Sequence, residues 1–470
     1  MLIEPAMDAK GTDPTERRYG LQHGILPQWA TLAQSLSSIA PTASPAMVIP
    51  LVIAVSGPSS WLVYLIATLG VSLVALHINV FAQSAASPGS LYGFVQDELG
   101  SWFGLVAGWA VLIAYIGTAS AVTGGVVIYA QGLLGGFLLQ RSGAVLLIAL
   151  SVLIATMLAY RNVELSTRFM LWIEAISIAM IVLLFLYPSH EHHLSWDASQ
   201  FSRQAFRLDS VRAGLILATF SFVGFESATA LGTEAKSPLI TIPRAVIGTA
   251  LLSGVLFIFS AYSEVAAFGG KLDLLTNSSA PLQLLAQLKG AAWLAPLLTI
   301  GAVVSFFACT LACMTAAART ALLFSSHGAL PSHLSRSHAI NQTPHIAIVV
   351  SGVATVLPAV WLTMRWTSAF DLYGWLGTIA TFGFVTAYLL VVVAALIRLK
   401  RRNKLVVWRM ATGAVTLLFL GWTLVGSLNL DATGPERWLA PAYCAILTVG
   451  VLCGAIFRKS RLDDGSGVSI

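Results

Sequence analysis

Apolar residues dominate the chain in long runs that are separated by short polar stretches. A helix needs about 20 mostly apolar residues to cross the hydrocarbon core of a bilayer, so we expect about twelve membrane-spanning helices. They fall near residues 31–56, 60–84, 101–131, 143–160, 165–187, 211–231, 244–268, 291–318, 344–364, 372–397, 408–427 and 438–457. The links are too short for a soluble domain, and the pattern therefore predicts an all-α integral membrane protein.

Two of these runs contain residues that interrupt a helix. The first reads SLSSIAPTASPAM over residues 35–47, where Pro41 and Pro45 each remove an N–H and clash with the preceding turn. The sixth reads SFVGFES over residues 221–227, where Gly224 weakens the helix. Free backbone groups inside a bilayer are tolerated where they line a cavity or bind something. The two breaks therefore predict a binding site.

The two breaks occupy corresponding places, because each lies in the first span of a unit of five. Five is an odd number, so the second unit enters the membrane from the opposite side, as in inverted-repeat transporters. We therefore expect a 5+5 inverted repeat with broken helices 1 and 6, followed by two further helices. The expected segments are an N-terminal tail 1–30, a first repeat 31–187, an external loop 188–210, a second repeat 211–397, two helices in 398–457 and a C-terminal tail 458–470.

Composition supports the membrane assignment. Hydrophobic residues make up 57% of the chain and charged residues 10%, with a mean hydropathy of +0.82. A soluble domain carries about 25% charged residues, so this chain cannot cover itself with a water-facing surface. The first 30 residues are polar, and we expect the first span itself, with no cleavable signal peptide, to direct insertion.

The net charge of +6 follows the spans and is not gathered into one patch, which argues against a nucleic-acid partner. Most basic residues fall on the side of the two termini, which predicts that both termini are cytoplasmic. Lys236, Arg244, Arg319 and Arg336 are expected to anchor the loops to the lipid surface. The other basic residues on that side are Arg17, Arg18, Arg161, Arg168, the cluster from Arg398 to Lys404, and those from Arg458 to Arg461.

Cysteine and histidine offer no metal or catalytic pattern. Cys309, Cys313, Cys444 and Cys453 lack the spacing of a zinc site and are expected to be small buried hydrophobic residues. The histidines sit mostly in loops, so we expect neither an enzyme nor a cofactor. The external group of His190, Glu191, His192 and His193 is expected to be a solvated loop.

Glu226 lies in the middle of the sixth span, where a carboxylate costs about 2.5–3.5 kcal/mol on insertion scales. Three interpretations remain open. It carries protons, since a dry environment favours the neutral acid; it is the counter-ion of a cationic substrate; or it caps the broken helix. Glu174 in the fifth span is a second candidate for proton coupling, facing either Glu226 or Arg168. Glu264 is expected to be interfacial.

Several stretches, in order, resemble bacterial permeases of the amino acid–polyamine–organocation (APC) superfamily. They are ASPGSLYGFV (86–95), GFESATALGTEAKSPLITIPRAV (224–246), AARTALLFSSHGALPSHL (317–334), TPHIAI (343–348) and DLYGWLGTIATFGF (371–384). The resemblance covers nearly the whole chain and implies a LeuT-like fold. It also implies secondary transport of amino acids or related amines. In such folds the first span offers N–H groups to the substrate carboxylate, the sixth offers carbonyls to its ammonium, and aromatic residues act as gates.

The resemblance implies particular substrate-binding residues. In the sixth span these are Ser221, Phe222, Val223, Gly224 and Phe225, with Phe225 or Phe222 as the gate. The first span departs from the Gly-Ser-Gly of many members. It offers Ala40, Thr42, Ala43 and Ser44 around Pro41, which has no N–H. Tyr115 in the third span and Ser305 in the eighth flank the site.

The sequence thus predicts a bacterial inner-membrane permease. It would take up a small amine-bearing solute, an amino acid first of all, by alternating access coupled to protons. The apolar neighbours of the predicted site favour a neutral or hydrophobic amino acid. An amino-acid or polyamine exchanger is the alternative, and a non-transporting sensor with a transporter fold is a further one.

Overall fold

The computed structural model describes residues 19–134, 140–161, 163–188, 197–202, 206, 208–269, 271–276, 278, 280–365, 367–427 and 434–463. The external histidine group, Arg17 and Arg18 lie outside the described residues. Within these ranges the chain is helical apart from its connections and one isolated bridge between Leu26 and Ala235. The all-α prediction is confirmed.

The long helices follow the predicted spans closely. The first span is divided into α1 (Gln28–Ile39), a π-helical turn η1 (Ser44–Val48) and α2 (Ile49–Ser56), and the sixth into α8 (Leu208–Phe220) and η6 (Ser227–Leu231). The continuous spans are α3 (Ser60–Ala82), α5 (Ser101–Leu134), α6 (Arg141–Arg161), α7 (Val163–Leu186), α9 (Pro238–Phe268), α12 (Leu294–Ser326), α13 (His345–Met364), α14 (Ala369–Arg401), α15 (Val407–Ser427) and α16 (Leu439–Asp463). The helices in the connections include α4 (Ser90–Leu99), α10 (Leu272–Thr276) and α11 (Pro281–Leu288).

Ten helical segments of the described chain are long and apolar enough to cross a membrane. The segment Gln28–Ala82 counts once although it holds the first two predicted spans. The sixth span is absent from the ten because its break leaves a helix of only 13 residues, α8. The first difference from twelve comes from the short 3₁₀ turn at Gly57–Ser59 that joins α2 directly to α3, and the second comes from the break in the sixth span.

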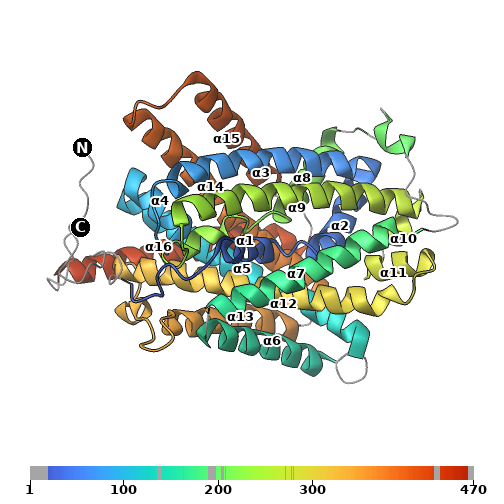
Figure 1. The fold of residues 1–470 in the computed structure, drawn as a ribbon, viewed down its shortest axis with the longest axis horizontal. Coiled ribbons are helices and arrows are strands. Elements are labelled where there is room, and N and C mark those ends of the chain that lie inside the picture. Colours follow the sequence, from blue (N-terminus) through green and yellow to red (C-terminus); the bar gives the residue numbers. More distant parts are fainter. Residues whose placement is uncertain are drawn as a thin grey trace.

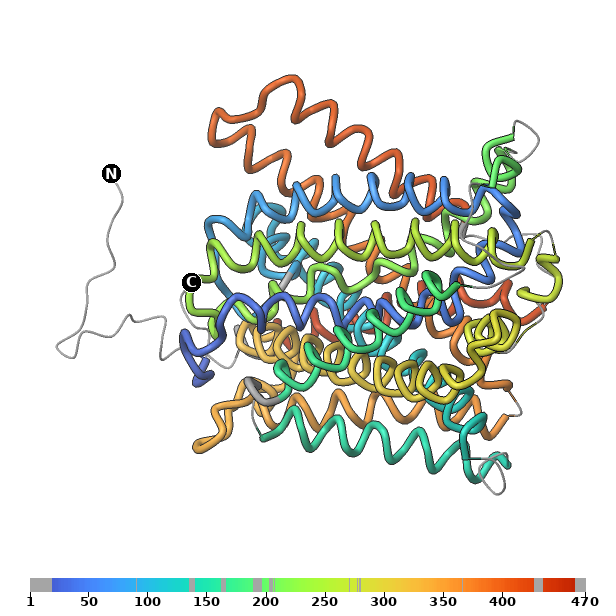
Figure 2. Tube along the Cα trace, turned by 45° about the vertical axis from the view of Figure 1, so that its right-hand side comes forward, coloured from blue at the N-terminus to red at the C-terminus, as the bar shows by residue number. Residues whose placement is uncertain are grey.

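Most long helices run side by side along the long axis of Figure 1, with the broken first span near the centre. We call the end of the bundle where α1 begins and α16 ends the terminal end, and the end where α2 meets α3 the opposite end. The helix α15 projects at one edge, as the second view also shows (Figure 2). Its exposed Trp408, Leu418 and Trp422 suit contact with lipid.

Small residues let α5 and α14 approach closely. A Cβ placed on Gly124 of α5 would lie 2.5 Å from the carbonyl oxygen of Ala369, and one on Gly383 of α14 would lie 2.5 Å from that of Ala110. Such contacts are the usual way to pack helices within a membrane. We call this closely packed pair of helices, against which the broken spans lie, the α5–α14 support.

The predicted burial of the cysteines is right for one pair and wrong for the other. Cys309 and Cys313 on α12 are buried, whereas Cys444 and Cys453 on α16 are exposed. Most of α16 faces outward at the edge of the bundle, and a lipid-facing position accepts a small apolar residue as well as a core position does.

Candidate functional site

The break in the first span begins at Ala40. This residue adopts the left-handed conformation, with φ 50° and ψ 70°, and its N–H donates to the carbonyl oxygen of Ser37. Pro41 then has no N–H to continue the helix, and regular structure resumes only at Ser44. Residues 40–42 therefore leave the α-helical path, and Ala43, with φ −64° and ψ −34°, is back in the α-helical region.

The break in the sixth span is built around Gly224. Its φ of +93° is a conformation that side-chain-bearing residues rarely adopt. A Cβ there would lie 2.8 Å from Ser38 Cβ and 3.0 Å from the Ser38 carbonyl oxygen. Glycine thus permits both the turn and the close approach of the two broken spans. The two breaks therefore approach each other through Gly224 and Ser38.

Hydroxyl groups join the two broken spans on the terminal side of the breaks. Ser227 Oγ donates to Ser38 Oγ at 2.7 Å and to the carbonyl oxygen of Gln34 at 3.1 Å. The N–H of Ala228 donates to Ser35 Oγ at 2.9 Å. These contacts satisfy polar groups that lipid could not, so α1 and η6 form one unit.

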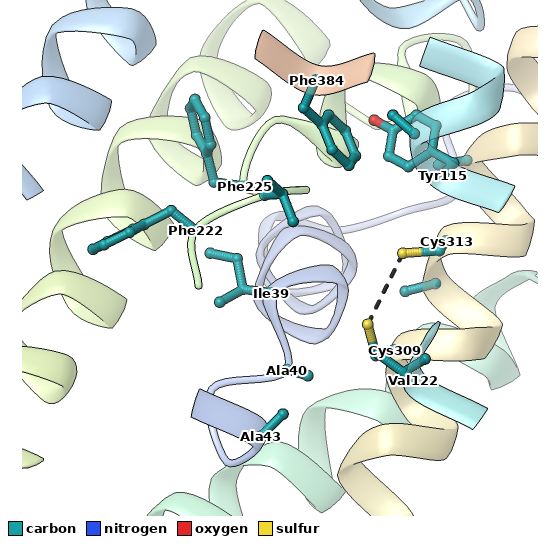
Figure 3. Packing of buried hydrophobic residues seen from close by; sticks show 14 of the residues in the cluster. Ile39, Ala40, Ala43, Tyr115, Val122, Phe222, Phe225, Cys309, Cys313 and Phe384 are labelled. Atoms are coloured by element: carbon teal, nitrogen blue, oxygen red, sulfur yellow. Dashed lines mark hydrogen bonds between the residues drawn. The ribbon is translucent and has the colours of Figure 1, made fainter. Parts of the chain in front are cut away.

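Helix α12 also holds α1. Gln34 Nε2 donates to the carbonyl oxygen of Ala312 at 2.8 Å, and Cys309 Sγ donates to that of Ser38 at 3.2 Å. The two thiols of Cys309 and Cys313 lie 3.9 Å apart and point toward the first span (Figure 3). Cys309 is a contact of the site that sequence reasoning treated only as packing.

Glu226 is buried and stands between two tyrosines from helices that are continuous. Tyr115 on α5 donates to Glu226 Oε1 at 2.8 Å, and Tyr388 on α14 donates to Oε2 at 2.5 Å. Glu226 occupies the N-cap position of η6, but its side chain makes no capping bond. The carboxyl group instead connects the unwound sixth span to the α5–α14 support.

Aromatic rings surround this carboxyl group. The rings of Phe225 and Tyr388 lie 5.5 Å apart between centroids, and those of Tyr115 and Phe384 lie 5.2 Å apart edge to face. Phe222 points away from the break in the first span (Figure 3), with its ring 5.1 Å from Phe257 on α9. Of the two predicted gate residues, Phe225 is therefore the one at the carboxyl group.

Three buried hydroxyls close to the breaks lack a hydrogen-bond partner within the described ranges. They are Ser37 Oγ in the last turn of α1, Thr42 Oγ1 in the unwound part of the first span, and Thr118 Oγ1, one turn beyond Tyr115 on α5. Buried polar groups are normally paired, by a ligand or water if not by protein. Thr42 was predicted from the sequence, whereas Thr118 was missed.

Glu174 and Ser305 form a second buried contact. Ser305 Oγ on α12 lies 3.0 Å from each carboxyl oxygen of Glu174 on α7. The serine predicted to touch substrate therefore bonds to the carboxyl group predicted to couple protons. Arg168 lies with its guanidinium 5.8 Å from the ring centroid of Trp29.

A buried ion pair lies toward the terminal end. Arg319 Nε donates to Glu234 Oε2 at 2.5 Å and its terminal nitrogen to Oε1 at 2.7 Å, with both side chains 1% exposed. The prediction that Arg319 is a lipid anchor is wrong, because the loop after η6 folds inward and brings Glu234 against α12. The N–H of Leu26 donates to the Glu234 carbonyl oxygen at 2.8 Å, so the chain before α1 is held there as well.

Rings close the site toward the opposite end. Tyr373 on α14 lies 5.7 Å from Phe220 and 6.1 Å from Phe306, and Phe306 lies 5.8 Å from Tyr129. The predicted Ser221 makes its hydrogen bond there, to the phenol of Tyr64 on α3 at 3.0 Å.

Glu264 on α9 was expected at an interface, and this prediction is wrong. The residue is only 1% exposed, and α9 packs against α3 and the first span. Sequence position near the end of a helix cannot show what covers it.

Tyr388 and Phe384 are the other site residues that sequence reasoning did not single out. A sequence signal for Tyr388 exists, because its phenol stands within an otherwise apolar run at membrane depth, as that of Tyr115 does. Nothing in the sequence, however, shows that both phenols converge on one carboxyl group from helices far apart along the chain.

Comparison with known proteins gives a consistent picture. Residues 26–452 match the sequence model of a family described as amino acid permeases. The branched-chain amino acid permease BcaP of Bacillus subtilis is 26% identical over 322 residues, which cover 64% of this chain and 67% of that protein. The methylthioribose transporter of the same organism is 27% identical, covering 64% and 68%. Cationic amino acid transporter 4 of Mus musculus is 23% identical, covering 72% and 54%.

A solved structure has the same fold. It is that of a Na⁺-coupled sialic acid symporter in a substrate-bound outward-open state, with a TM-score of 0.51 and 14% identity, covering 88% of this chain and 93% of that one. At this identity the likeness concerns the fold alone. It confirms the LeuT-like fold that the resemblance implied.

Proposed function

We propose that this chain, which belongs to the amino acid permease family, is a proton-driven secondary transporter for a small amino acid with an uncharged side chain. One observation carries the proposal. Both oxygens of Glu226 accept phenol hydrogen bonds at the point where the two broken spans meet. Burial favours the neutral acid, whereas the two phenol donors favour the carboxylate, so the site contains a carboxyl group that can change its protonation and that is not open to a cationic side chain.

The backbone of the breaks suits the two charged groups of an amino acid. The N-terminal end of η1, near Thr42 and Ser44, carries the positive end of a helix dipole and suits the carboxylate. The C-terminal end of α8, near Ser221 and Phe222, carries the negative end and suits the ammonium. The unpartnered Thr42 hydroxyl is a further donor for the carboxylate.

The remaining surface favours an apolar side chain. Ile39, Ala40, Ala43, Phe225 and Phe384 are all buried around the breaks (Figure 3). A cationic side chain would need a free carboxylate here, since burying an unpaired charge is costly. The name of the Bacillus subtilis relative, a branched-chain amino acid permease, agrees with this preference. The relatives also include proteins named for other substrates, so the structural argument decides the proposal.

Protonation of Glu226 would change how the sixth span is held. An ionised carboxyl group accepts from both phenols, whereas a protonated one must direct its own O–H to an acceptor. Tyr115 and Tyr388 belong to the α5–α14 support, so their bonds to Glu226 fix the span relative to that support. Binding or release of a proton by Glu226 would therefore shift the equilibrium of the sixth span between two positions.

Substrate and coupling are tested together by uptake into proteoliposomes, using a labelled panel of amino acids and polyamines with and without an inward proton gradient. We expect gradient-stimulated accumulation of a neutral apolar amino acid, and Glu226→Gln should remove the stimulation while keeping binding. Rapid exchange against preloaded solute without accumulation would indicate an exchanger. Binding without any flux would indicate a sensor.

We also propose the topology given by the basic residues, in which the terminal end faces the cytoplasm of a bacterial cell and the repeats are 31–187 and 211–397. Arg398 and Arg401 at the end of α14 both pair with Glu98 of α4, at 3.2 and 3.1 Å, and add to the positive charge of this end. A reporter protein that is active only in the cytoplasm should therefore be active when it is fused to the C-terminus.

A further inference from the structure

Glu264 is a buried carboxyl group that the proposed transport site does not use. It lies one turn before the end of α9, on the side of the opposite end of the bundle, and is 1% exposed. Neither of its carboxyl oxygens has a hydrogen-bond partner within the described ranges. Both oxygens therefore lack the donors that a carboxylate normally requires.

Among the described residues, the titratable groups that interact with Glu264 are two phenols. Tyr64 from α3 and Tyr129 from α5 lie within electrostatic range of its carboxyl group. Both hydroxyls are already engaged, Tyr64 with Ser221 Oγ at 3.0 Å and Tyr129 with the carbonyl oxygen of Ala46 at 2.9 Å. Two charged residues are nearby, Lys271 directly before α10 and Asp273 within it, and both are exposed.

An ionised Glu264 would be expensive in this environment. A buried carboxylate without a counter-ion or donors loses its hydration and gains nothing in return. A metal cation is a poor solution, because hard cations need several converging oxygen ligands and the phenols here are engaged elsewhere. A single proton neutralises the group without any further ligand.

We propose that Glu264 is a second proton site, which holds a proton in the conformation seen here and releases it when the opposite end opens to water. The proposal rests on the proton-driven transport proposed above. The two phenols beside Glu264 bond to the broken spans, through Ser221 in the sixth and Ala46 in the first. Charging Glu264 would therefore act on both spans at once.

Infrared difference spectroscopy of the purified full-length protein tests the proton directly. We expect a protonated-carboxyl carbonyl stretch that Glu264→Gln removes and that Asp273→Asn, which changes an exposed carboxyl group near the same end, retains. An unchanged stretch in Glu264→Gln would overturn the proposal. Sodium titrations of substrate binding form a second arm. If sodium stimulates binding to the wild type and not to Glu264→Gln, a metal cation and not a proton neutralises Glu264, and the proposal is overturned.

Transport assays separate this proposal from the previous one. Glu264→Gln should keep substrate counterflow. Its uptake should depend less than that of the wild type on the pH of the solution at the opposite end of the bundle. Absence of uptake by the wild type would refute the proposed function, whereas the infrared result would still decide the state of Glu264. Glu264→Met is a second variant for the case that Glu264→Gln does not fold, because an apolar side chain should be able to replace a carboxyl group that is neutral. Failure of both variants to fold would mean that the charge is required and would also overturn the proposal.

Discussion

Replacing Gly224 by alanine should weaken substrate binding strongly, because the new Cβ has no room in the break. The φ of +93° is strained for alanine, which costs about 1–3 kcal/mol at such positions. The Cβ would also lie 2.8 Å from Ser38 Cβ, and forcing an extra carbon into a packed site costs about 1–3 kcal/mol. The sum of about 2–6 kcal/mol corresponds to roughly 30-fold to a few ten-thousand-fold in the population of the binding-competent arrangement.

The assay is equilibrium binding of the labelled substrate to purified protein, together with thermal unfolding in detergent. Gly248→Ala on α9 is the matched control, because a Cβ there meets nothing within 4 Å and should leave binding unchanged. The strain must appear either as lost affinity or as a lowered Tm. If Gly224→Ala binds within twofold of the wild type and unfolds at the same temperature, the close approach of the two broken spans is not part of the site.

Three further changes test other contacts. Tyr388→Phe removes one of the two donors to Glu226 and should shift the pH dependence of uptake, whereas Tyr443→Phe, whose hydroxyl bonds to Thr386, should not. Arg319→Met leaves Glu234 as an unpaired buried charge and should cost about 3–5 kcal/mol in thermal unfolding, which the double variant with Glu234→Met should largely restore. Thr42→Val should weaken binding of an amino acid more than that of the corresponding amine, because the hydroxyl is proposed to serve the carboxylate; equal losses would contradict this role.

The three interpretations of Glu226 show how far the sequence reaches. The free-energy cost of placing a carboxyl group at membrane depth is enough to indicate that the group is functional. Its role depends on what its oxygens touch, and these partners are Tyr115 and Tyr388, which lie 111 and 162 residues away along the chain. Their bonds argue against the counter-ion interpretation, the side chain makes no capping bond to η6, and the proton carrier stays a proposal until Glu226→Gln is measured.

Arg319 and Glu264 were misjudged for a related reason. Both stand near the ends of apolar runs, where charged side chains ordinarily reach the lipid surface or water. In the folded chain the loop after η6 turns inward and gives Arg319 a partner, whereas Glu264 is covered and receives none from the part of the chain that the structure describes. Burial near a helix end depends on loops and neighbouring helices, and these leave no periodic signal in the sequence.

The sequence by itself determined the membrane spans, the two breaks and the LeuT-like fold. Hydrocarbon length sets the spacing of apolar runs, and proline or glycine must appear where a helix opens. Tertiary structure alone decided that Gly224 touches Ser38, that two phenols hold Glu226, and that Ser305 belongs to Glu174. These pairings join residues on different helices, whose rotation and depth follow from how the small residues of the bundle let the helices pack.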